Sequence, residues 1–367
     1  MLIFNLIGLS MAGIAVENLL GLTCEELEEL AVAHHQPRYR GRQLYRAIYA
    51  RRQTDFAALT DLDKSFRQLL SNNYRVQYPS IERRFESRDG AVRYLLALED
   101  DQTVEAVSMP EEDRTTLCLS SQAGCAVDCH FCFTALLGLK RNLTAGEIVG
   151  QVLAILADRQ LPAQSRLNIV FMGMGEPLLN FASVMKSVKL LSDSGGMAIP
   201  WRRIALSTVG IVPGIKKLAS EAKRPKLAIS LNASTEEQRT ALMPVNRKYP
   251  LRDLLAACRV YPLRPGERLT FEYVMIDGFN DSPEDARRVA KLLGGLRAKV
   301  NLIPYNPGPE MPYHSPLPKR VLAFQKVLTE RQLPAFIRVS RGQDVRAACG
   351  QLSLAGLDVQ NHPAPTT

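Results

Sequence analysis

The chain has 367 residues and carries 46 lysines and arginines against 37 aspartates and glutamates, a formal net charge of +9. Hydrophobic residues make up 46% of it and charged residues 23%, which excludes a largely disordered chain, a collagen and a polytopic membrane protein. The length exceeds the usual ~100–200 residues of one domain, so we expect a large domain and a smaller one. The positive charge indicates an anionic partner, such as nucleic acid or an acidic membrane surface.

The first 22 residues are apolar, but they lack the form of a signal peptide or a membrane span. No lysine or arginine precedes Arg38, and polar residues, among them Asn5 and Glu17, interrupt the apolar run. We therefore expect a cytoplasmic protein without a membrane segment. Either Met1 or Met11 fits as the start, and residues 358–367 are expected to form a loose tail.

Residues 24–75 have the patterns of short helices, with Thr23 as the expected cap of the first and 55–70 as a further amphipathic helix. Residues 38–52 carry six arginines and no acid, with apolar and aromatic residues interleaved: Tyr39, Leu44, Tyr45, Ile48 and Tyr49. Such a run is either a solvated helix face or a surface that contacts RNA phosphates and stacks on bases.

The pattern of apolar and polar residues changes after residue 80. Asp89-Gly90 predicts a hairpin turn between strands at 83–88 and 92–98, and residues 103–109 alternate like a third strand. This segment leads into the larger domain.

From residue 115 onward, strand and helix patterns alternate, which predicts a parallel sheet with helices outside. Six or seven such units favour an α/β fold, a partial (β/α)6 TIM-like barrel, with a doubly wound sheet as the alternative; both place the site at the strands' C-terminal ends. The expected strands are 115–120, 167–172, 203–207, 226–231, 269–275, 300–303 and 335–339. The expected helices are 145–158, 181–192, 211–222, 235–242, 251–261, 283–293 and 318–330.

Three of the seven cysteines, Cys125, Cys129 and Cys132, lie in GCAVDCHFCF directly after the first of these strands. Three thiols so close together in a cytoplasmic protein indicate a metal or cluster site rather than disulfides. Zinc sites and iron–sulfur clusters normally take four protein ligands, so a cluster with three leaves one iron open to something else. The alternative is a zinc site completed by His130 or a distant residue.

The cysteine spacing, with Phe131 before the last cysteine, resembles the radical S-adenosylmethionine superfamily. The resemblance implies that Cys125, Cys129 and Cys132 hold a [4Fe–4S] cluster and that S-adenosylmethionine chelates its open iron. Electron transfer would then cleave the sulfonium to a 5′-deoxyadenosyl radical.

A second motif, NIVFMGMGEP at 168–177, runs from a buried strand into a glycine-rich turn. Gly173 and Gly175 allow the backbone to approach a ligand closely, and Glu176 is suited to accept a hydrogen bond from the cofactor's ammonium group. By itself the turn is an ordinary strand–helix junction. One strand–helix unit after the cysteines, it resembles the superfamily's Gly-Glu cofactor contact.

Four longer strings together resemble the RlmN family of dual-specificity adenosine carbon-2 methyltransferases that act on 23S rRNA and tRNA. They are EEDRTTLCLSSQAGCAVDCHFCFT (111–134), MGMGEPLLN (172–180), NLIPYNP (301–307) and RGQDVRAACGQL (341–352). The resemblance covers roughly residues 15–355. It implies a radical S-adenosylmethionine core at 111–345, preceded by a basic, helical RNA-binding domain at 1–80 and a hairpin extension at 81–110. Residues 346–367 would form the C-terminal segment.

The resemblance also implies roles for single residues. Cofactor contacts are expected from Gly175, Glu176, Ser207, Ser230, Leu231, Asn232 and Asn306. The family often has histidine where this chain has Asn232, and asparagine keeps the hydrogen-bonding ability. Taken singly, a lone cysteine is usually a buried apolar residue, and Cys24 and Cys258 keep that interpretation.

The resemblance implies catalytic roles for Cys349, Cys118 and Glu105. Cys349 would take a methyl group from one S-adenosylmethionine, and a second molecule would supply the radical that activates it. Adenine carbon 2 would then join the sulfur-bound carbon in a protein–RNA thioether, and Glu105 would take the ring proton. Cys118 would attack Cys349 and release the product, leaving a disulfide.

The expected partners are 23S rRNA and tRNA, with the target base out of its stack, and a flavodoxin-type electron donor. A monomer is expected. Two alternatives remain: a Cfr-like enzyme that methylates adenine carbon 8, and a non-catalytic RNA-binding protein with structural zinc.

Overall fold

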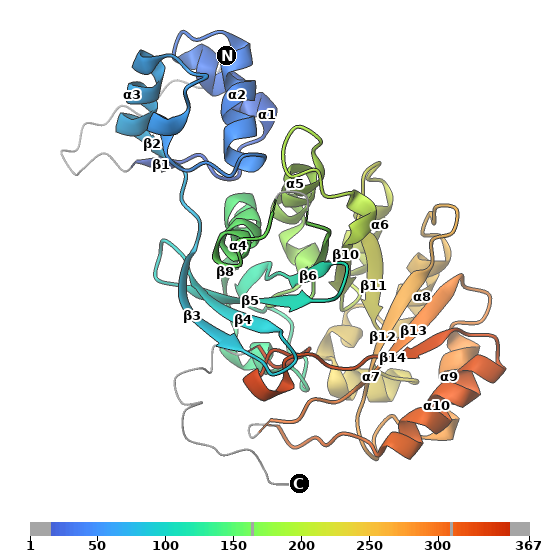
Figure 1. Cartoon of the computed structure of the whole chain (residues 1–367). Coiled ribbons are helices and arrows are strands. Elements are labelled where there is room, and N and C mark those ends of the chain that lie inside the picture. Colours follow the sequence, from blue (N-terminus) through green and yellow to red (C-terminus); the bar gives the residue numbers. More distant parts are fainter. Residues whose placement is uncertain (1–15, 163–164, 309–310, 353–367) are drawn as a thin grey trace. The chain divides into compact units, whose positions relative to one another are not determined.

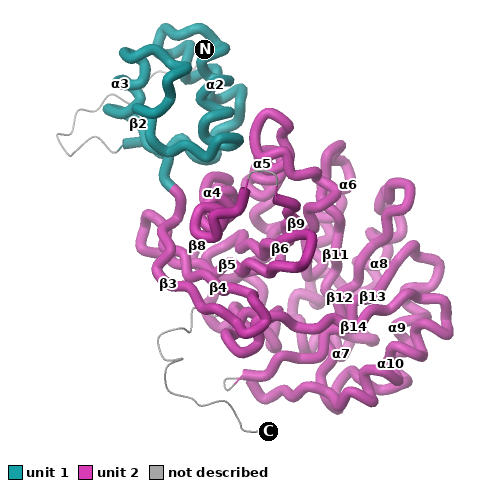
Figure 2. Tube along the Cα trace, in the orientation of Figure 1, with its two compact units in different colours: residues 1–77 teal, residues 78–367 magenta. Residues whose placement is uncertain are grey.

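The computed structural model describes residues 16–162, 165–308 and 311–352 (Figure 1). The chain forms two compact units, residues 1–77 and 78–367 (Figure 2). The expected start of the chain and its expected loose tail lie outside the described residues. Within the described ranges, no helix is both long and apolar enough to cross a membrane.

The first unit contains three helices among its described residues: α1 (Cys24–Ala33), α2 (Arg38–Tyr49) and α3 (Lys64–Asn73). Strand β1 (Glu17–Asn18) pairs in parallel with β2 (Tyr74–Arg75) and closes the unit. Thr23 caps α1 as expected, in a reciprocal capping box with Glu26. The helix expected at 55–70 is wrong in its first half, because Asp63 accepts the Phe66 amide and starts α3 anew.

The aromatic residues of α2 belong to the core of this unit. Tyr45 and Tyr49 are 2% and 1% exposed. The Tyr49 hydroxyl donates to the Leu22 carbonyl at 2.9 Å and accepts from the Gly21 amide at 2.8 Å. The suggestion that these two rings stack on RNA bases is therefore wrong; they are turned inward by helix packing.

Three of the six arginines of residues 38–52 pair with acidic side chains elsewhere in the unit. Arg42 lies 2.7 Å from Glu28 of α1, and Arg38 lies 3.6 Å from the same carboxylate. Arg51 pairs with Asp61 at 3.1 Å. This pairing favours the solvated-face interpretation of the run, and an RNA-binding role for it stays a prediction.

The second unit is built on one sheet of ten described strands, in the order β14-β13-β12-β11-β10-β9-β6-β5-β4-β3. The predicted hairpin is confirmed: β3 (Ser80–Glu86), β4 (Val92–Ala97) and β5 (Thr103–Pro110) form an antiparallel extension. It joins the parallel part through β6 (Thr115–Cys118), which is antiparallel to β5 and parallel to β9.

Seven of the described strands run parallel: β6, β9 (Leu167–Phe171), β10 (Ile204–Thr208), β11 (Lys226–Ser230), β12 (Leu269–Met275), β13 (Ala298–Pro304) and β14 (Ala335–Ile337). They follow one another in sequence order without the reversal that a doubly wound sheet requires. The partial barrel is therefore the correct alternative of the two predicted architectures.

The helices that connect these strands lie outside the curved sheet (Figure 1). They are α4 (Ala145–Asp158), α5 (Phe181–Ser192), α6 (Val212–Ala219), α7 (Glu236–Leu242), α8 (Leu251–Arg259), α9 (Pro283–Leu292) and α10 (Pro318–Glu330). Their positions confirm the predicted alternation, with ends within a few residues of those expected.

The two faces of the parallel sheet differ in composition. Leu206, Phe271 and Val300 are fully buried and belong to the alternating set beneath the helices. The opposite face carries small or polar residues such as Ala228 and Thr270, which line a cavity. The hydrophobic core therefore lies between sheet and helices, and the inside of the barrel stays open for a site.

Candidate active site

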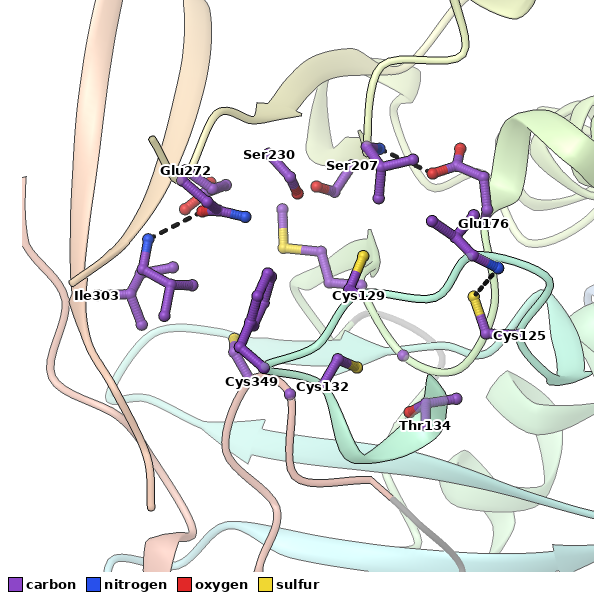
Figure 3. A pocket seen from close by; sticks show the side chains of 18 of the residues that line it. Cys125, Cys129, Cys132, Thr134, Glu176, Ser207, Ser230, Glu272, Ile303 and Cys349 are labelled. Carbon is purple, nitrogen blue, oxygen red and sulfur yellow. Dashed lines mark hydrogen bonds between the residues drawn. The ribbon is translucent and has the colours of Figure 1, made fainter. Parts of the chain in front are cut away.

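The cysteine loop follows β6 and is bracketed by a small hairpin of β7 (Gln122–Gly124) and β8 (Leu139–Asn142). The Cys125 amide donates to the Gly138 carbonyl at 3.1 Å, and the Cys132 amide donates to the Cys129 carbonyl at 3.0 Å. These bonds turn all three cysteines toward one cavity of about 160 Å³ at the strands' C-terminal ends (Figure 3).

The surroundings of the three thiols disfavour their charged form. Burial raises the pKa of Cys125 to about 12 and also raises that of Cys132. Burial, then the neighbouring Cys132 and Cys125, raises the pKa of Cys129 well above its usual value. Thiolates here need a positively charged partner, and three soft sulfur donors on one cavity wall fit an iron–sulfur cluster. No three described His, Cys, Asp or Glu side chains are arranged to hold a single metal ion.

The glycine-rich turn after β9 forms the next wall of the cavity. Gly175 has a φ of +95°, and a Cβ there would lie 2.5 Å from the Gln122 side chain. A Cβ at Gly173 would lie 2.7 Å from the Leu119 carbonyl oxygen. Both positions therefore need glycine for the turn to pack against the start of the cysteine loop.

Glu176 lies at the end of this turn and is 2% exposed. Its carboxylate accepts the Leu178 amide at 3.0 Å and the Val209 amide at 2.8 Å, which connects the turn to the loop after β10. Burial raises the pKa of Glu176 to about 7 in spite of these bonds. A carboxylate can accept further hydrogen bonds, so the group stays suited to an amino group of a ligand.

The remaining predicted cofactor contacts divide into those that line the cavity and one that does not. Ser207, Ser230, Asn232 and Asn306 line it, and Figure 3 shows Ser207 and Ser230 facing it from neighbouring strand ends. Leu231 is fully buried and is not among the residues that line the cavity, so a contact from it stays a prediction. Asn232 has a φ of +56°, and its Oδ1 accepts the Val274 amide at 2.9 Å.

The segment that carries Cys349 is fastened to the β3–β4 hairpin. Asp344 accepts the Ser87 hydroxyl at 2.5 Å, and Asp89 accepts the Arg341 guanidinium at 3.0 Å and the Gly342 amide at 2.9 Å. The hairpin thus holds a segment some 250 residues later in the chain.

The same segment is also bound to the cysteine loop. The Gly350 carbonyl accepts the Phe133 amide at 2.9 Å, and the Leu352 carbonyl accepts the Thr134 hydroxyl at 2.6 Å. Asn306 donates to the Cys349 carbonyl at 3.2 Å. These contacts place Cys349 on the wall of the cavity that Cys132 also lines (Figure 3).

Cys349 and Cys118 share a second cavity, of about 360 Å³, which adjoins the first inside the barrel. Although Cys349 as a residue is exposed, its thiol is enclosed by the cavity walls. This loss of hydration, then the Glu272 carboxylate, raises its pKa to about 11. Burial, then Cys349, raises the pKa of Cys118. Both residues are free thiols here, so the structure does not contain the disulfide that the sequence suggested.

Two family models match the chain. One describes the radical SAM superfamily and matches residues 119–292, and the other describes the N-terminal domain of the ribosomal RNA large subunit methyltransferase and matches residues 17–76. The chain is 52% identical over 334 residues to a probable dual-specificity RNA methyltransferase RlmN of Koribacter versatilis, covering 86% of this chain and 96% of that one.

The chain belongs to the RlmN family. A second member, from Syntrophobacter fumaroxidans, is 46% identical over 331 residues, covering 90% of this chain and 96% of its own. The crystal structure of a radical SAM methyltransferase from Sphaerobacter thermophilus has a TM-score of 0.87 and 45% identity, and covers 92% of this chain and 99% of that one. The predicted family and fold class are confirmed.

Membership of the RlmN family also confirms the predicted enzyme class, a radical S-adenosylmethionine methyltransferase. It excludes the alternative of a non-catalytic zinc protein. The superfamily implies a [4Fe–4S] cluster and S-adenosylmethionine, and the donor set of the first cavity fits both.

Glu105 lies apart from the two described cavities, although the RlmN resemblance assigns it the role of base. Its side chain is fully buried in β5 and forms an ion pair with Arg93 of β4, whose guanidinium stacks 4.1 Å from the Phe85 ring. The role of base stays a prediction. To act as a base, Glu105 would have to accept a proton while still paired with Arg93, or break the ion pair first.

Sequence reasoning missed Arg239, whose hydrogen bonds hold together several backbone segments around the first cavity of this RlmN-family chain. It is fully buried and donates to the carbonyls of Val209 and Ser230 at 2.5 and 3.2 Å and to Asn246 at 2.8 Å. Burial lowers its pKa to about 10. Its sequence context, EEQRTAL, is that of an ordinary surface helix, so no local signal marked it.

Proposed function

We propose that this chain methylates carbon 2 of adenosine in 23S rRNA and tRNA. Cys349 would carry the methyl group, and Cys118 would release the product. The observation that carries the proposal is the shared cavity: both thiols line it, and Cys349 also lines the cavity of the three loop cysteines. The relatives named dual-specificity RNA methyltransferases support the substrate class.

The cofactors have proposed places in the first cavity. Cys125, Cys129 and Cys132 would hold a [4Fe–4S] cluster, and S-adenosylmethionine, used twice per turnover, would contact the surrounding residues: Gly175, Glu176, Ser207, Ser230, Asn232, Asn306 and the Leu231 backbone. When bound, these groups supply the methyl group and one-electron chemistry. Such chemistry suits the target, because adenine carbon 2 lies between two ring nitrogens and is too electron-poor to be an ordinary nucleophile.

Cys349 acts first in the proposed sequence. It must lose a thiol proton before its sulfur accepts a methyl group, and its pKa of about 11 shows that few molecules are ionised at neutral pH. Its place between the two cavities allows the sulfur to meet the methyl donor in one and the substrate base in the other. The carbon on its sulfur would lose one hydrogen atom to the one-electron chemistry that the second S-adenosylmethionine supplies, and would then bond to carbon 2 of adenine. The ring adduct would give up one electron to the cluster and its proton to a base, the predicted role of Glu105.

Cys118 acts last. Its thiolate attacks the sulfur of Cys349, so that an S–S bond forms while the bond from Cys349 to the substrate carbon breaks. The electron pair of the broken bond stays on that carbon, which takes a proton and becomes the new methyl group. A flavodoxin-type electron donor and a monomeric state remain predictions.

The Cys118→Ala variant tests this assignment. Without the second thiol, the thioether between Cys349 and RNA should persist and appear as a covalent adduct in denaturing gels and intact mass. The matched control is Cys24→Ala in the first unit, which should turn over normally. Normal product release by Cys118→Ala would contradict the role of Cys118.

Nucleoside mass spectrometry of the wild-type product tests the substrate position. We expect 2-methyladenosine in both 23S rRNA and tRNA after anaerobic reconstitution with S-adenosylmethionine and a reductant. Formation of 8-methyladenosine would show the Cfr-like activity instead.

A further inference from the structure

The second cavity has an unusual lining for the interior of a β/α barrel. Such interiors are normally filled with layers of branched apolar side chains. Here the inward positions of β10, β11 and β12 are Ala205, Ala228 and Thr270, which leave about 360 Å³ open. That volume is within the ~300–1,000 Å³ typical of small-molecule sites.

Three cations line this cavity: Lys226 at the start of β11, Lys299 in β13 and Arg338 just after β14. Within the described part of the chain, none of their side chains has an ion pair or a hydrogen bond; the Lys299 ammonium lies 5.9 Å from the Phe336 ring. The fourth basic residue of the lining, Arg341, is already paired with Asp89.

The cations outnumber the acids that face them. Glu272 is the one acidic residue among the described lining residues, and it accepts the Asn301 amide at 2.9 Å. Burial lowers the pKa of Lys299; the Glu272 carboxylate opposes this shift, and the nearby Lys226 and Arg338 add to it. Lys226 and Arg338 are exposed and Lys299 is half-buried. An excess of positive charge on one cavity wall favours the binding of an anion there.

The position of the cations relative to the cysteines sets the size of the anion. Lys226 lies four residues before Ser230 on β11, and Lys299 lies four residues before Ile303 on β13. At a rise of ~3.3 Å per residue, Lys226 and Lys299 are about 13 Å along the barrel from the end that carries Cys349. Arg338 follows directly after Ile337 of β14, which pairs with Leu302 of β13, so its backbone lies nearer to that end. The separation between the two lysines and Cys349 is of the order of one extended nucleotide.

We propose that Lys226, Lys299 and Arg338 form a phosphate-binding subsite for the substrate RNA strand. The backbone phosphates beside the target adenosine bind these cations, and the unstacked base extends along the cavity to Cys118 and Cys349. This subsite rests on the proposed function, because it takes RNA as the substrate. It also explains why the interior is lined by small side chains, since the cavity must admit a base and its ribose.

Neutral substitutions test the subsite: Lys299→Gln, Arg338→Gln and the triple variant that adds Lys226→Gln. The binding of an unmodified tRNA transcript is measured by filter binding over a range of salt concentrations. Loss of three phosphate contacts should lower the slope of log K against log salt by about two, at ~0.7 per contact for single strands. The matched control is Lys216→Gln with Lys291→Gln, two exposed lysines on α6 and α9, which should leave the slope unchanged.

Two further measurements separate a lost phosphate contact from misfolding. Lys299→Arg and Arg338→Lys keep the charge and should keep wild-type RNA affinity. Methylation of Cys349 itself, followed by intact mass in the absence of RNA, should proceed normally in the Lys226→Gln/Lys299→Gln double variant, which keeps Arg338, the cation that opposes the effect of burial on the pKa of Cys349. A salt slope equal to that of the control pair would overturn the subsite.

The same assays distinguish the subsite from the proposed function. If the wild-type protein binds RNA through these cations but forms 8-methyladenosine, the subsite stands and the proposed position of methylation falls. If it forms 2-methyladenosine and the triple variant binds RNA like the control, the subsite alone falls. Absence of RNA binding by the wild type would overturn both.

Discussion

The arginines of α2 and the cations inside the barrel carry the same charge in different surroundings. Arg38 and Arg42 lie at the surface of the first unit and share Glu28 as a partner. Lys226 and Lys299 face a cavity in which the cations exceed the acids. A charged surface that is neutralised by its own unit needs no external anion, whereas a cavity with unbalanced cations does. The more conspicuous basic run in the sequence is therefore the weaker candidate for holding RNA.

Substitution of a buried charged residue in the barrel unit should change the free energy of unfolding far more than substitution of a surface charge in the first unit. Arg239→Met leaves the carbonyls of Val209 and Ser230 and the side-chain oxygen Oδ1 of Asn246 without this donor. We expect the free energy of unfolding to fall by about 3 kcal/mol or more, because several buried acceptors lose their donor at about 1–3 kcal/mol each. Denaturant unfolding at neutral pH measures the loss, and a loss below about 1 kcal/mol would show that these hydrogen bonds are dispensable.

Glu176 tests whether burial inside the barrel is costly for a charge of the opposite sign. Its pKa rises from 4.5 to about 7 on folding, so between these values the folded chain binds more protons than the unfolded one. The free energy of unfolding should therefore fall as the pH rises through this window, by up to about 3 kcal/mol. At lower pH this loss is absent, because the carboxyl is protonated in both states.

Glu176→Gln removes that titration. The variant loses hydrogen-bond geometry at every pH, but its free energy of unfolding relative to the wild type should improve by up to about 3 kcal/mol between pH 4.5 and 8. Thermal unfolding of both proteins across this range measures the difference. A difference that stays constant with pH would show that Glu176 is ionised throughout.

The smallest effect is expected at the surface of the first unit. The Arg42 side chain is 55% exposed, and its pair with Glu28 is open to solvent. Arg42→Met should change the free energy of unfolding by at most about 1 kcal/mol, as for other exposed pairs. The binding of tRNA should also change little. A large loss of RNA affinity would restore the α2 arginines as an RNA-binding surface and weaken the contrast with the barrel interior.

Local features were predictable because their signals lie within a few residues. The helices at 145–158 and 318–330, the hairpin turn at Asp89-Gly90 and the alternation of strand and helix all appear as expected. The cysteine spacing and the turn at Gly173 and Gly175 are likewise local, because backbone conformation and ligand spacing depend on neighbouring residues.

Features that depend on distant partners were not predictable in the same way. The burial of Tyr45 and Tyr49, the pairing of Arg42 with Glu28 and the ion pair of Glu105 with Arg93 each join separate elements. A helix pattern shows which residues share a face. When basic and aromatic residues are interleaved, the pattern does not show which of these faces packs against the core. The late start of α3 has a similar origin. Asp63 caps a new helix at this point, and the chain therefore does not form the longer helix expected from the pattern.

The sequence by itself determined the family resemblance, the order of elements and the three cysteines of the loop, because these are carried by composition and short spacing. Only the tertiary structure decided where Cys349 lies, since it reaches the cysteine loop through contacts with a hairpin about 250 residues away. It also decided that Lys226, Lys299 and Arg338 meet in one cavity. Two cations on strands and one just after a strand come to line one cavity only when the sheet curves into a barrel, and no pattern along the chain records that closure.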